Sequence, residues 1–258
     1  MTSQKQNADI FRDFHVKGNP LILFNIWDAG SAKVVEEAGA KAIATGSWSV
    51  AAANGFADGE AIPLDFVIEN LKRVVRSVDL PVSLDFEGGY AADNSLLKEN
   101  IKRVIEAGAV GINFEDQIIG GEELYSVEEQ CSRIAAIREA ASETGIPIFI
   151  NARTDVFLKR YPAEQNMQQL DEAIRRALAY TDAGASGFFV PALRSSAMIE
   201  KLCTVSAIPV NIMVLPDTPP TSELAELGVA RISYGPGPYR TMSNALKEAA
   251  KKAFGENI

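Results

Sequence analysis

Residues 82–115 read VSLDFEGGYAADNSLLKENIKRVIEAGAVGINFE, and this stretch decides the fold. A short apolar run at 82–86 is followed by a helical pattern over 96–107 and by a second apolar run at 111–115. The helical pattern ends in Glu-Ala-Gly-Ala at 106–109, where glycine suits the left-handed conformation that closes many helices. The stretch therefore predicts one strand–helix–strand unit.

The same unit recurs along the chain. The strand candidates are short, rich in Ile, Val and Phe, and mostly apolar on both faces, as parallel strands covered on both sides are. They span 21–27, 42–45, 82–86, 111–115, 148–152, 187–190, 210–214 and 231–234. Helical patterns lie over 63–78, 96–107, 127–142, 170–183 and 242–254. The phrase that ends the helix at 106–109 also occurs at 37–40 and, with Asp in place of Glu, at 182–185.

Strict alternation of strands and helices over eight units, without a linker, predicts one (β/α)8-barrel domain over residues 1–258. An extra N-terminal helix is expected at 3–16. The competing fold is an open, doubly wound sheet, which usually has a glycine-rich dinucleotide turn after its first strand. Here that turn reads WDAGSA at 27–32, which lacks the fingerprint, so the barrel is favoured.

Composition narrows the class of protein. The chain has 258 residues with a formal net charge of −9, which argues against nucleic acid and anionic membrane surfaces as partners. The two cysteines, Cys131 and Cys203, lie in helical stretches without a second ligand at metal-binding spacing, which suits a reducing compartment. The polar N-terminus does not resemble a signal peptide. A soluble cytoplasmic protein is expected.

Acidic side chains gather where the predicted strands end, which is where barrel enzymes carry their active sites. Asp85 and Glu87 follow the third strand and are expected to share one strand face, because side chains alternate. Glu115 ends the fourth strand, and Asp58 lies in the loop after the second. Acids crowded in one pocket repel one another unless a proton or cation intervenes, and oxygen ligands suit Mg²⁺ or Mn²⁺. The alternative for each acid is a helix cap or a lysine pair.

Other polar residues complete the expected site. Arg153 on the fifth strand could grip a carboxylate or phosphoryl group in two places, or pair structurally with Asp155 or Glu115. The turn Gly46-Ser47-Trp48 could offer backbone N–H groups to an anion. The only histidine, His15, precedes the first strand, so a Ser-His-Asp device is excluded.

These strand-end residues resemble, in order and spacing, those of the isocitrate lyase and phosphoenolpyruvate mutase superfamily. The resemblance extends from about residue 21 to residue 235. It rests on three motifs, which are Val-Ser-Leu-Asp-Phe-Glu-Gly-Gly-Tyr at 82–90, Gly-Ile-Asn-Phe-Glu-Asp-Gln at 111–117 and Asn-Ala-Arg-Thr-Asp at 151–155. It implies a barrel whose last helix is exchanged between subunits of a homodimer or homotetramer.

The resemblance also implies a site. Asp85 would be the most direct ligand of Mg²⁺, and Asp58, Glu87 and Glu115 would act mostly through bound waters. The substrate would be a small 2-oxo acid, held by the backbone of Gly46, Ser47 and Trp48 and by Arg153, which could instead steady the shell of the metal. We expect Arg153 and Glu115 to act in catalysis and Asn211, on the seventh strand, to contact the substrate.

The chain departs from the superfamily in places that bear on the reaction. Residue 87 is Glu where Asp is usual. The segment 118–125, Ile-Ile-Gly-Gly-Glu-Glu-Leu-Tyr, lacks both the Lys-Lys-Cys-Gly-His loop of the lyases and the Lys-Thr-Asn gating loop of the mutase. Glu122 or Tyr125 could donate a proton in its place, although an exposed loop acid is the simpler interpretation.

The sequence favours a Mg²⁺-dependent lyase that acts on a small 2-oxo or 2-hydroxy carboxylate through an enolate, by C–C cleavage or decarboxylation. One alternative is P–C bond chemistry on phosphonopyruvate. The other is a barrel that binds a metabolite without turnover.

Overall fold

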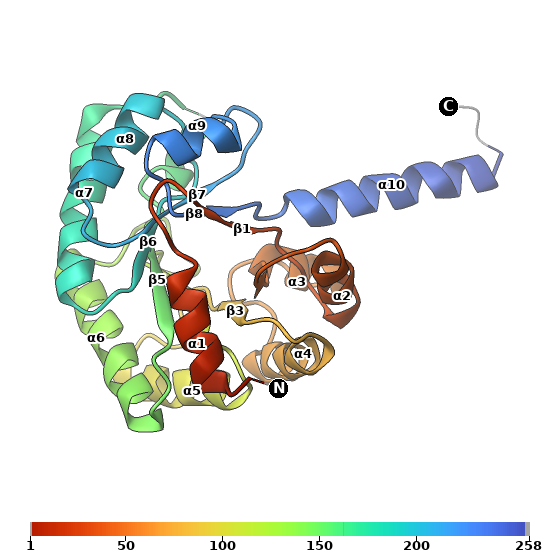
Figure 1. The fold of residues 1–258 in the computed structure, drawn as a ribbon, viewed down its shortest axis with the longest axis horizontal. Helices are drawn as coiled ribbons and strands as arrows, with labels where there is room; N and C mark the ends of the chain where they lie inside the picture. Colours follow the sequence, from red (N-terminus) through yellow and green to blue (C-terminus); the bar gives the residue numbers. More distant parts are fainter. Residues whose placement is uncertain (1, 162, 256–258) are drawn as a thin grey trace.

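The computed structural model describes residues 2–161 and 163–255, and it contains the expected barrel (Figure 1). Eight parallel strands form one sheet in the order β1-β8-β7-β6-β5-β4-β3-β2. A parallel bridge between Ile26 and Thr45 joins β1 to β2 and brings the two edges of the sheet together. The strands are β1 (Leu21–Leu23), β2 (Ile43–Ala44), β3 (Val82–Asp85), β4 (Gly111–Glu115), β5 (Phe149–Arg153), β6 (Gly187–Phe189), β7 (Val210–Met213) and β8 (Arg231–Ser233).

Helices surround this sheet, and each predicted helical pattern is confirmed, with ends shifted by up to five residues. They are α1 (Gln4–Asp13), α2 (Ala29–Glu37), α3 (Ser47–Ala53), α4 (Leu64–Ser77), α5 (Asn94–Glu106), α6 (Val127–Thr144), α7 (Met167–Asp182), α8 (Ser196–Val205), α9 (Thr221–Glu226) and α10 (Gly237–Ala253), with a 3₁₀ turn at Leu158–Arg160. In α4, Val67, Leu71 and Val74 are buried at helical spacing, so one stripe of the helix packs on the barrel.

The extra N-terminal helix is confirmed as α1, and it covers the end of the barrel opposite the strand carboxyl ends. Its Phe11 is fully buried beneath the strands. A Cβ atom at Gly111, on β4, would lie 2.6 Å from the Phe11 ring, so glycine is what allows the ring to enter. His15 stacks on Phe149 at 4.0 Å between ring centroids, and burial lowers the pKa of this histidine to about 3. His15 is thus part of the barrel floor, at the end of the barrel opposite the strand carboxyl ends.

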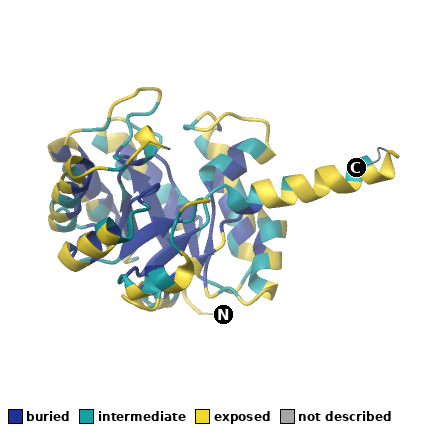
Figure 2. Cartoon of the chain, turned by 90° about the horizontal axis from the view of Figure 1, so that it is seen from above, coloured by how far each residue is buried: buried dark blue, intermediate teal, exposed yellow. Residues whose placement is uncertain are grey.

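The last helix, α10, begins five residues before the predicted start at residue 242. Pro236 is its N-cap and a second proline, Pro238, lies in its first turn, a position that tolerates proline because the first helical N–H groups have no partner in the helix. The Gly-Pro-Gly-Pro run at 235–238 therefore opens a helix. Beyond this turn, α10 projects away from the barrel and is exposed along its length (Figures 1 and 2).

Most of the apolar side chains lie between the sheet and the helices, and the strands are the most deeply buried elements (Figure 2). Across the described residues, none of the helices is long and apolar enough to cross a lipid bilayer.

Candidate active site

A cavity of about 240 Å³ lies at the carboxyl ends of the strands. It contains several predicted residues together with side chains that the sequence did not single out. The predicted lining residues are Gly46, Ser47, Trp48, Asp58, Asp85 and Arg153. The additional ones are Asn25, Ser49, Asn113, Leu158, Tyr161, Phe189, Met213, Leu215, Ser233, Gly235, Pro236 and Arg240.

Asp85 ends β3 and is held from both sides. Its Oδ2 accepts hydrogen bonds from the backbone N–H of Ser47, at 2.9 Å, and from the Ser47 hydroxyl, at 2.8 Å. Its Oδ1 lies 3.4 Å from the Nδ2 of Asn113, on the neighbouring strand. The Ser47 amide, expected to bind the carboxylate of a substrate, thus holds the carboxylate of Asp85. The result is a carboxylate with a fixed orientation on the cavity wall.

Glu87 lies behind this wall. The expectation that residues 85 and 87 share one strand face is wrong, because β3 ends at Asp85 and Glu87 has a positive φ of 50°. The Glu87 carboxylate accepts hydrogen bonds from the backbone N–H groups of Gly59 and Glu60, at 3.1 and 3.0 Å, and from the Tyr90 hydroxyl, at 2.8 Å. Burial raises its pKa to about 7, and the nearby charge of Asp85 acts in the same direction.

Asp58 lines the cavity itself, and burial followed by the charge of Asp85 raises its pKa. Two carboxylates therefore share the cavity.

Arg153 is bound to two buried carboxylates. Its Nη1 lies 2.9 Å from Glu115 Oε2, and its Nε and Nη2 donate to the two oxygens of Asp155 at 2.6 and 2.8 Å. Burial raises the pKa of Glu115 well above its usual range, the charges of Asp155, Asp85 and Glu87 add to the effect, and Arg153 opposes it. The structural ion pairs considered from sequence are both present, and Arg153 still lines the cavity.

Asp116 supports this arrangement from behind. Its Oδ1 accepts the backbone N–H of Asp155 at 3.1 Å, and its Oδ2 accepts from Arg176 and the Tyr180 hydroxyl, both at 2.9 Å. Asp116 is fully buried, and both of its carboxylate oxygens accept these hydrogen bonds. It therefore fixes Asp155, which in turn fixes Arg153.

The acids fit a divalent cation that one or two carboxylates hold directly. Asp85 and Asp58 supply hard oxygen atoms at the cavity. Behind them, burial raises the pKa values of Glu87 and Glu115, and the negative charge of Asp85 adds to both shifts. Over residues 2–161 and 163–255, no three Asp, Glu, His or Cys side chains converge closely enough to hold one ion. Asp85, with Asp58 beside it, would then hold Mg²⁺, and water and substrate oxygens would complete its shell.

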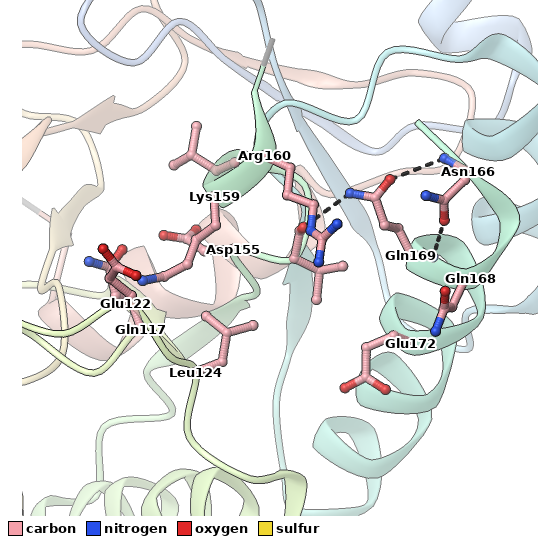
Figure 3. Close-up of a pocket in the computed structure, with 12 residues that line it drawn as sticks. Gln117, Glu122, Leu124, Asp155, Lys159, Arg160, Asn166, Gln168, Gln169 and Glu172 are labelled. Atoms are coloured by element: carbon pink, nitrogen blue, oxygen red, sulfur yellow. Dashed lines mark hydrogen bonds between the residues drawn. The ribbon is translucent and has the colours of Figure 1, made fainter. Parts of the chain in front are cut away.

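Three other residues named from sequence lie outside this cavity. Asn211 is buried, and its carboxamide and the Ser233 hydroxyl donate to each other at 3.1 and 3.2 Å. The ring of Tyr125 stacks on the Arg133 guanidinium, at 4.2 Å. Glu122 faces a second, larger cavity of about 780 Å³, in which Gln117 and Glu122 lie on one side, α7 on the other, and Lys159 and Arg160 between them (Figure 3).

The segment 118–125 leaves and rejoins the barrel at one point. Gln117 and Leu124 form an antiparallel bridge, the backbone N–H of Ile118 donates to the Glu123 carbonyl at 3.1 Å, and that of Tyr125 donates to the Asp116 carbonyl at 2.8 Å. The two ends of the segment are therefore fastened to each other.

Arg240 is the most informative residue that sequence reasoning missed. It lies in the first turns of α10, and its guanidinium stacks over the Trp48 ring at 4.7 Å from the centroid. In the described part of the chain it forms no ion pair with a carboxylate. The signal that could have found it is the proline-containing helix start after the eighth strand, which places residue 240 one turn beyond the barrel rim.

Comparisons with known proteins identify the family of the chain. The family model described as phosphoenolpyruvate phosphomutase matches residues 11–254. The 2-methylisocitrate lyase of Escherichia coli K12 is 30% identical over 249 residues, which cover 92% of this chain and 81% of the lyase. A crystal structure of a candidate phosphonomutase from Burkholderia cenocepacia J2315 is 49% identical, with a TM-score of 0.95, and the match covers 97% of this chain and 100% of that one.

A phosphonopyruvate hydrolase crystallised with oxalate and Mg²⁺ shares the fold with a TM-score of 0.82 at 20% identity, over 96% of this chain and 88% of that one. The resemblance drawn from the three strand-end motifs is thus confirmed. The chain belongs to the phosphoenolpyruvate phosphomutase family, within the superfamily of isocitrate lyase and phosphoenolpyruvate mutase.

Proposed function

We propose that the protein is a Mg²⁺-dependent lyase that acts on a small 2-oxo or 2-hydroxy carboxylate. The main support for this proposal is the lining of the cavity, in which the fixed carboxylate of Asp85 faces the same space as an apolar wall. That wall consists of Leu158, Phe189, Met213 and Leu215. An apolar wall accommodates a carbon substituent, and the acid end accommodates a metal-chelating 2-oxo acid.

The chain's own residues would divide the work. Asp85, fixed by Ser47, would hold Mg²⁺ with Asp58 beside it. When bound, Mg²⁺ supplies electrophilic stabilisation of the oxygen on which negative charge develops. Arg153 presents its positive charge to the same cavity from β5, and its pairs with Glu115 and Asp155 keep it in place.

Arg240 would bind a second anionic group of the substrate. It lines the cavity, and its stacking on Trp48 leaves its N–H groups free of a carboxylate partner among the described residues. A guanidinium in this state suits a carboxylate, which it can bind through two N–H groups. A dicarboxylate with an alkyl substituent would satisfy both Arg240 and the apolar wall.

P–C bond chemistry on phosphonopyruvate is the second candidate. Its support is the 49% identity to the candidate phosphonomutase of Burkholderia cenocepacia. A phosphonate dianion needs several donors, and because Arg153 is already shared between two carboxylates, Arg240 would be the cation left for it. The apolar wall suits the alkyl substituent of a lyase substrate better, so we favour the lyase.

Substrate profiling tests the proposal. The protein is incubated with Mg²⁺ and oxaloacetate, a series of alkyl-substituted malates, or phosphonopyruvate, and pyruvate and inorganic phosphate are both followed. Production of a 2-oxo acid without phosphate supports the lyase, and phosphate release from phosphonopyruvate refutes it. Asp85→Asn should abolish turnover, and Asp171→Asn, a surface change on α7, should leave it unchanged. Tight binding without turnover throughout the series would instead support the non-catalytic barrel.

We further propose that a second copy of the chain covers α10. Met242, Leu246 and Phe254 on this helix are exposed, Leu246 to 65%, although they are apolar. A groove of about 430 Å³ beside β1 and α2 is also apolar, and its lining includes Ile22, Phe24 and Val34. The apolar side of α10 in one copy could pack into the apolar groove of a second copy. This pairing supports a homodimer or homotetramer.

A further inference from the structure

Beneath the candidate site, the barrel interior contains a guanidinium that no carboxylate neutralises at ion-pair distance within the described residues. It belongs to Arg231, on β8, which is 0% exposed. Among the described residues, its Nε and Nη1 have no hydrogen-bond partner, and its Cζ lies 6.0 Å from the centroid of the Phe11 ring. Burying a cation in this way is costly, and removal of such a group often leaves a protein equally or more stable. Its presence therefore points to a role other than stability.

The side chain of Arg231 makes a hydrogen bond that leads towards the site. Its Nη2 donates to the Oδ1 of Asn113, at 2.9 Å, across the barrel. The Nδ2 of Asn151, on β5, donates to the same oxygen at 2.8 Å. Because two donors converge on this oxygen, the carboxamide of Asn113 must present its NH2 group on the other side. That NH2 group lies 3.4 Å from Asp85 Oδ1, and Asn113 lines the cavity.

A charged donor on the carbonyl oxygen also changes the chemistry of the amide. It draws electron density towards that oxygen, so that the NH2 group at the other end becomes a stronger hydrogen-bond donor. Burial lowers the pKa of Arg231 to about 9, and the charge of Asp85 opposes the effect. The guanidinium therefore keeps its proton at neutral pH.

We propose that Asn113, polarised by Arg231, donates a hydrogen bond to the substrate oxygen on which negative charge develops, and that Arg231 is the positioning residue behind it. A donor fixed in advance at such an oxygen stabilises the transition state more than the ground state. The inference rests on the proposed function, because it takes that oxygen to be the enolate oxygen beside Asp85.

The test uses oxalate, a dianion with the shape of the pyruvate enolate, and measures its binding by calorimetry at saturating Mg²⁺. The variants are Arg231→Met, Arg231→Lys and Asn113→Ala. Arg231→Met and Asn113→Ala should weaken oxalate binding by about tenfold or more, as loss of a hydrogen bond to a charged group does. Arg231→Lys, which keeps the charge, should lie between them and the wild type. Binding of Mg²⁺ alone should change much less.

Arg138→Met is the matched control. Arg138 donates to the backbone oxygens of Ile148 and Gly184, away from the cavity, so its loss should lower Tm and leave oxalate affinity unchanged. Arg231→Met should instead weaken oxalate binding without lowering Tm. If a folded Arg231→Met protein binds oxalate as tightly as the wild type does, this inference is wrong whatever the Tm, and the proposed function is unaffected. If Arg231→Met does not fold, wild-type affinity in Arg231→Lys and Asn113→Ala together would overturn it. Failure of the wild type to bind Mg²⁺ and oxalate would overturn the proposed function as well.

Discussion

Replacing Glu87 with Gln should make the metal-free protein more stable, by an amount that grows as the pH rises from about 4.5 to 7. The carboxylate is 4% exposed, and burial raises its pKa from 4.5 to about 7. Because the pKa is higher in the folded state, the folded protein binds the proton more tightly than the unfolded chain does. The stability contributed by the protonated form is full below pH 4.5 and is lost as the pH rises through 7.

The magnitude follows from that difference in pKa. Each unit is worth about 1.4 kcal/mol, so ionisation of Glu87 costs about 3 kcal/mol of folding free energy above pH 7. Glutamine keeps the acceptor oxygen for the backbone N–H groups of Gly59 and Glu60 and carries no charge. For a chain of this size, the gain corresponds to a rise in Tm of roughly 6 to 12 °C.

The assay is urea denaturation in the presence of a chelator, at half-unit steps from pH 4 to pH 8.5. The difference between the Glu87→Gln and wild-type stabilities should be smallest at pH 4 and should grow by about 3 kcal/mol by pH 8. Glu99→Gln, a change on the exposed face of α5, controls for the substitution itself. Parallel curves for Glu87→Gln and the wild type across this range would show that the buried carboxylate does not titrate as reasoned.

Four further outcomes are expected. Arg240→Met should raise KM for a dicarboxylate by about tenfold or more while kcat changes little, since the lost contact holds a remote group; steady-state kinetics would contradict this if KM were unchanged. Removal of divalent ions with a chelator should abolish turnover, and added Mg²⁺ should restore it; activity that persists would refute the metal assignment. Leu246→Asp should dissociate the oligomer, and a wild-type mass in light scattering would argue against packing through α10. Phe11→Ala should lower the free energy of unfolding by about 3 to 5 kcal/mol in urea denaturation, and a loss below about 1 kcal/mol would contradict the placement of Phe11 beneath the barrel.

The barrel was predictable because its signal is repeated. Each strand–helix unit carries its own apolar run, and most units have a glycine just after the helix, so an error in one unit does not change the fold. The positions of Asp58, Asp85 and Arg153 followed from the rule that strand carboxyl ends converge at one end of a barrel.

The direction of individual side chains was less predictable. Alternation along a strand placed Glu87 beside Asp85, but the strand ends at Asp85 and the positive φ of Glu87 breaks the alternation. Arg240 was missed because a run of glycine and proline indicates a turn unless the flanking helix is known. The Arg231–Asn113 contact joins residues 118 positions apart, and nothing in the sequence near either residue signals it.

The fastened ends of the segment 118–125 have an evolutionary consequence. The bridge between Gln117 and Leu124 and the hydrogen bond from Tyr125 to Asp116 close this loop at its base. Residues between these anchors can be inserted, deleted or exchanged while Glu115 and Asp116 stay in place. Such a loop allows new substrate preferences to arise by local replacement, and it offers a cassette through which loops of related enzymes could be grafted onto this barrel.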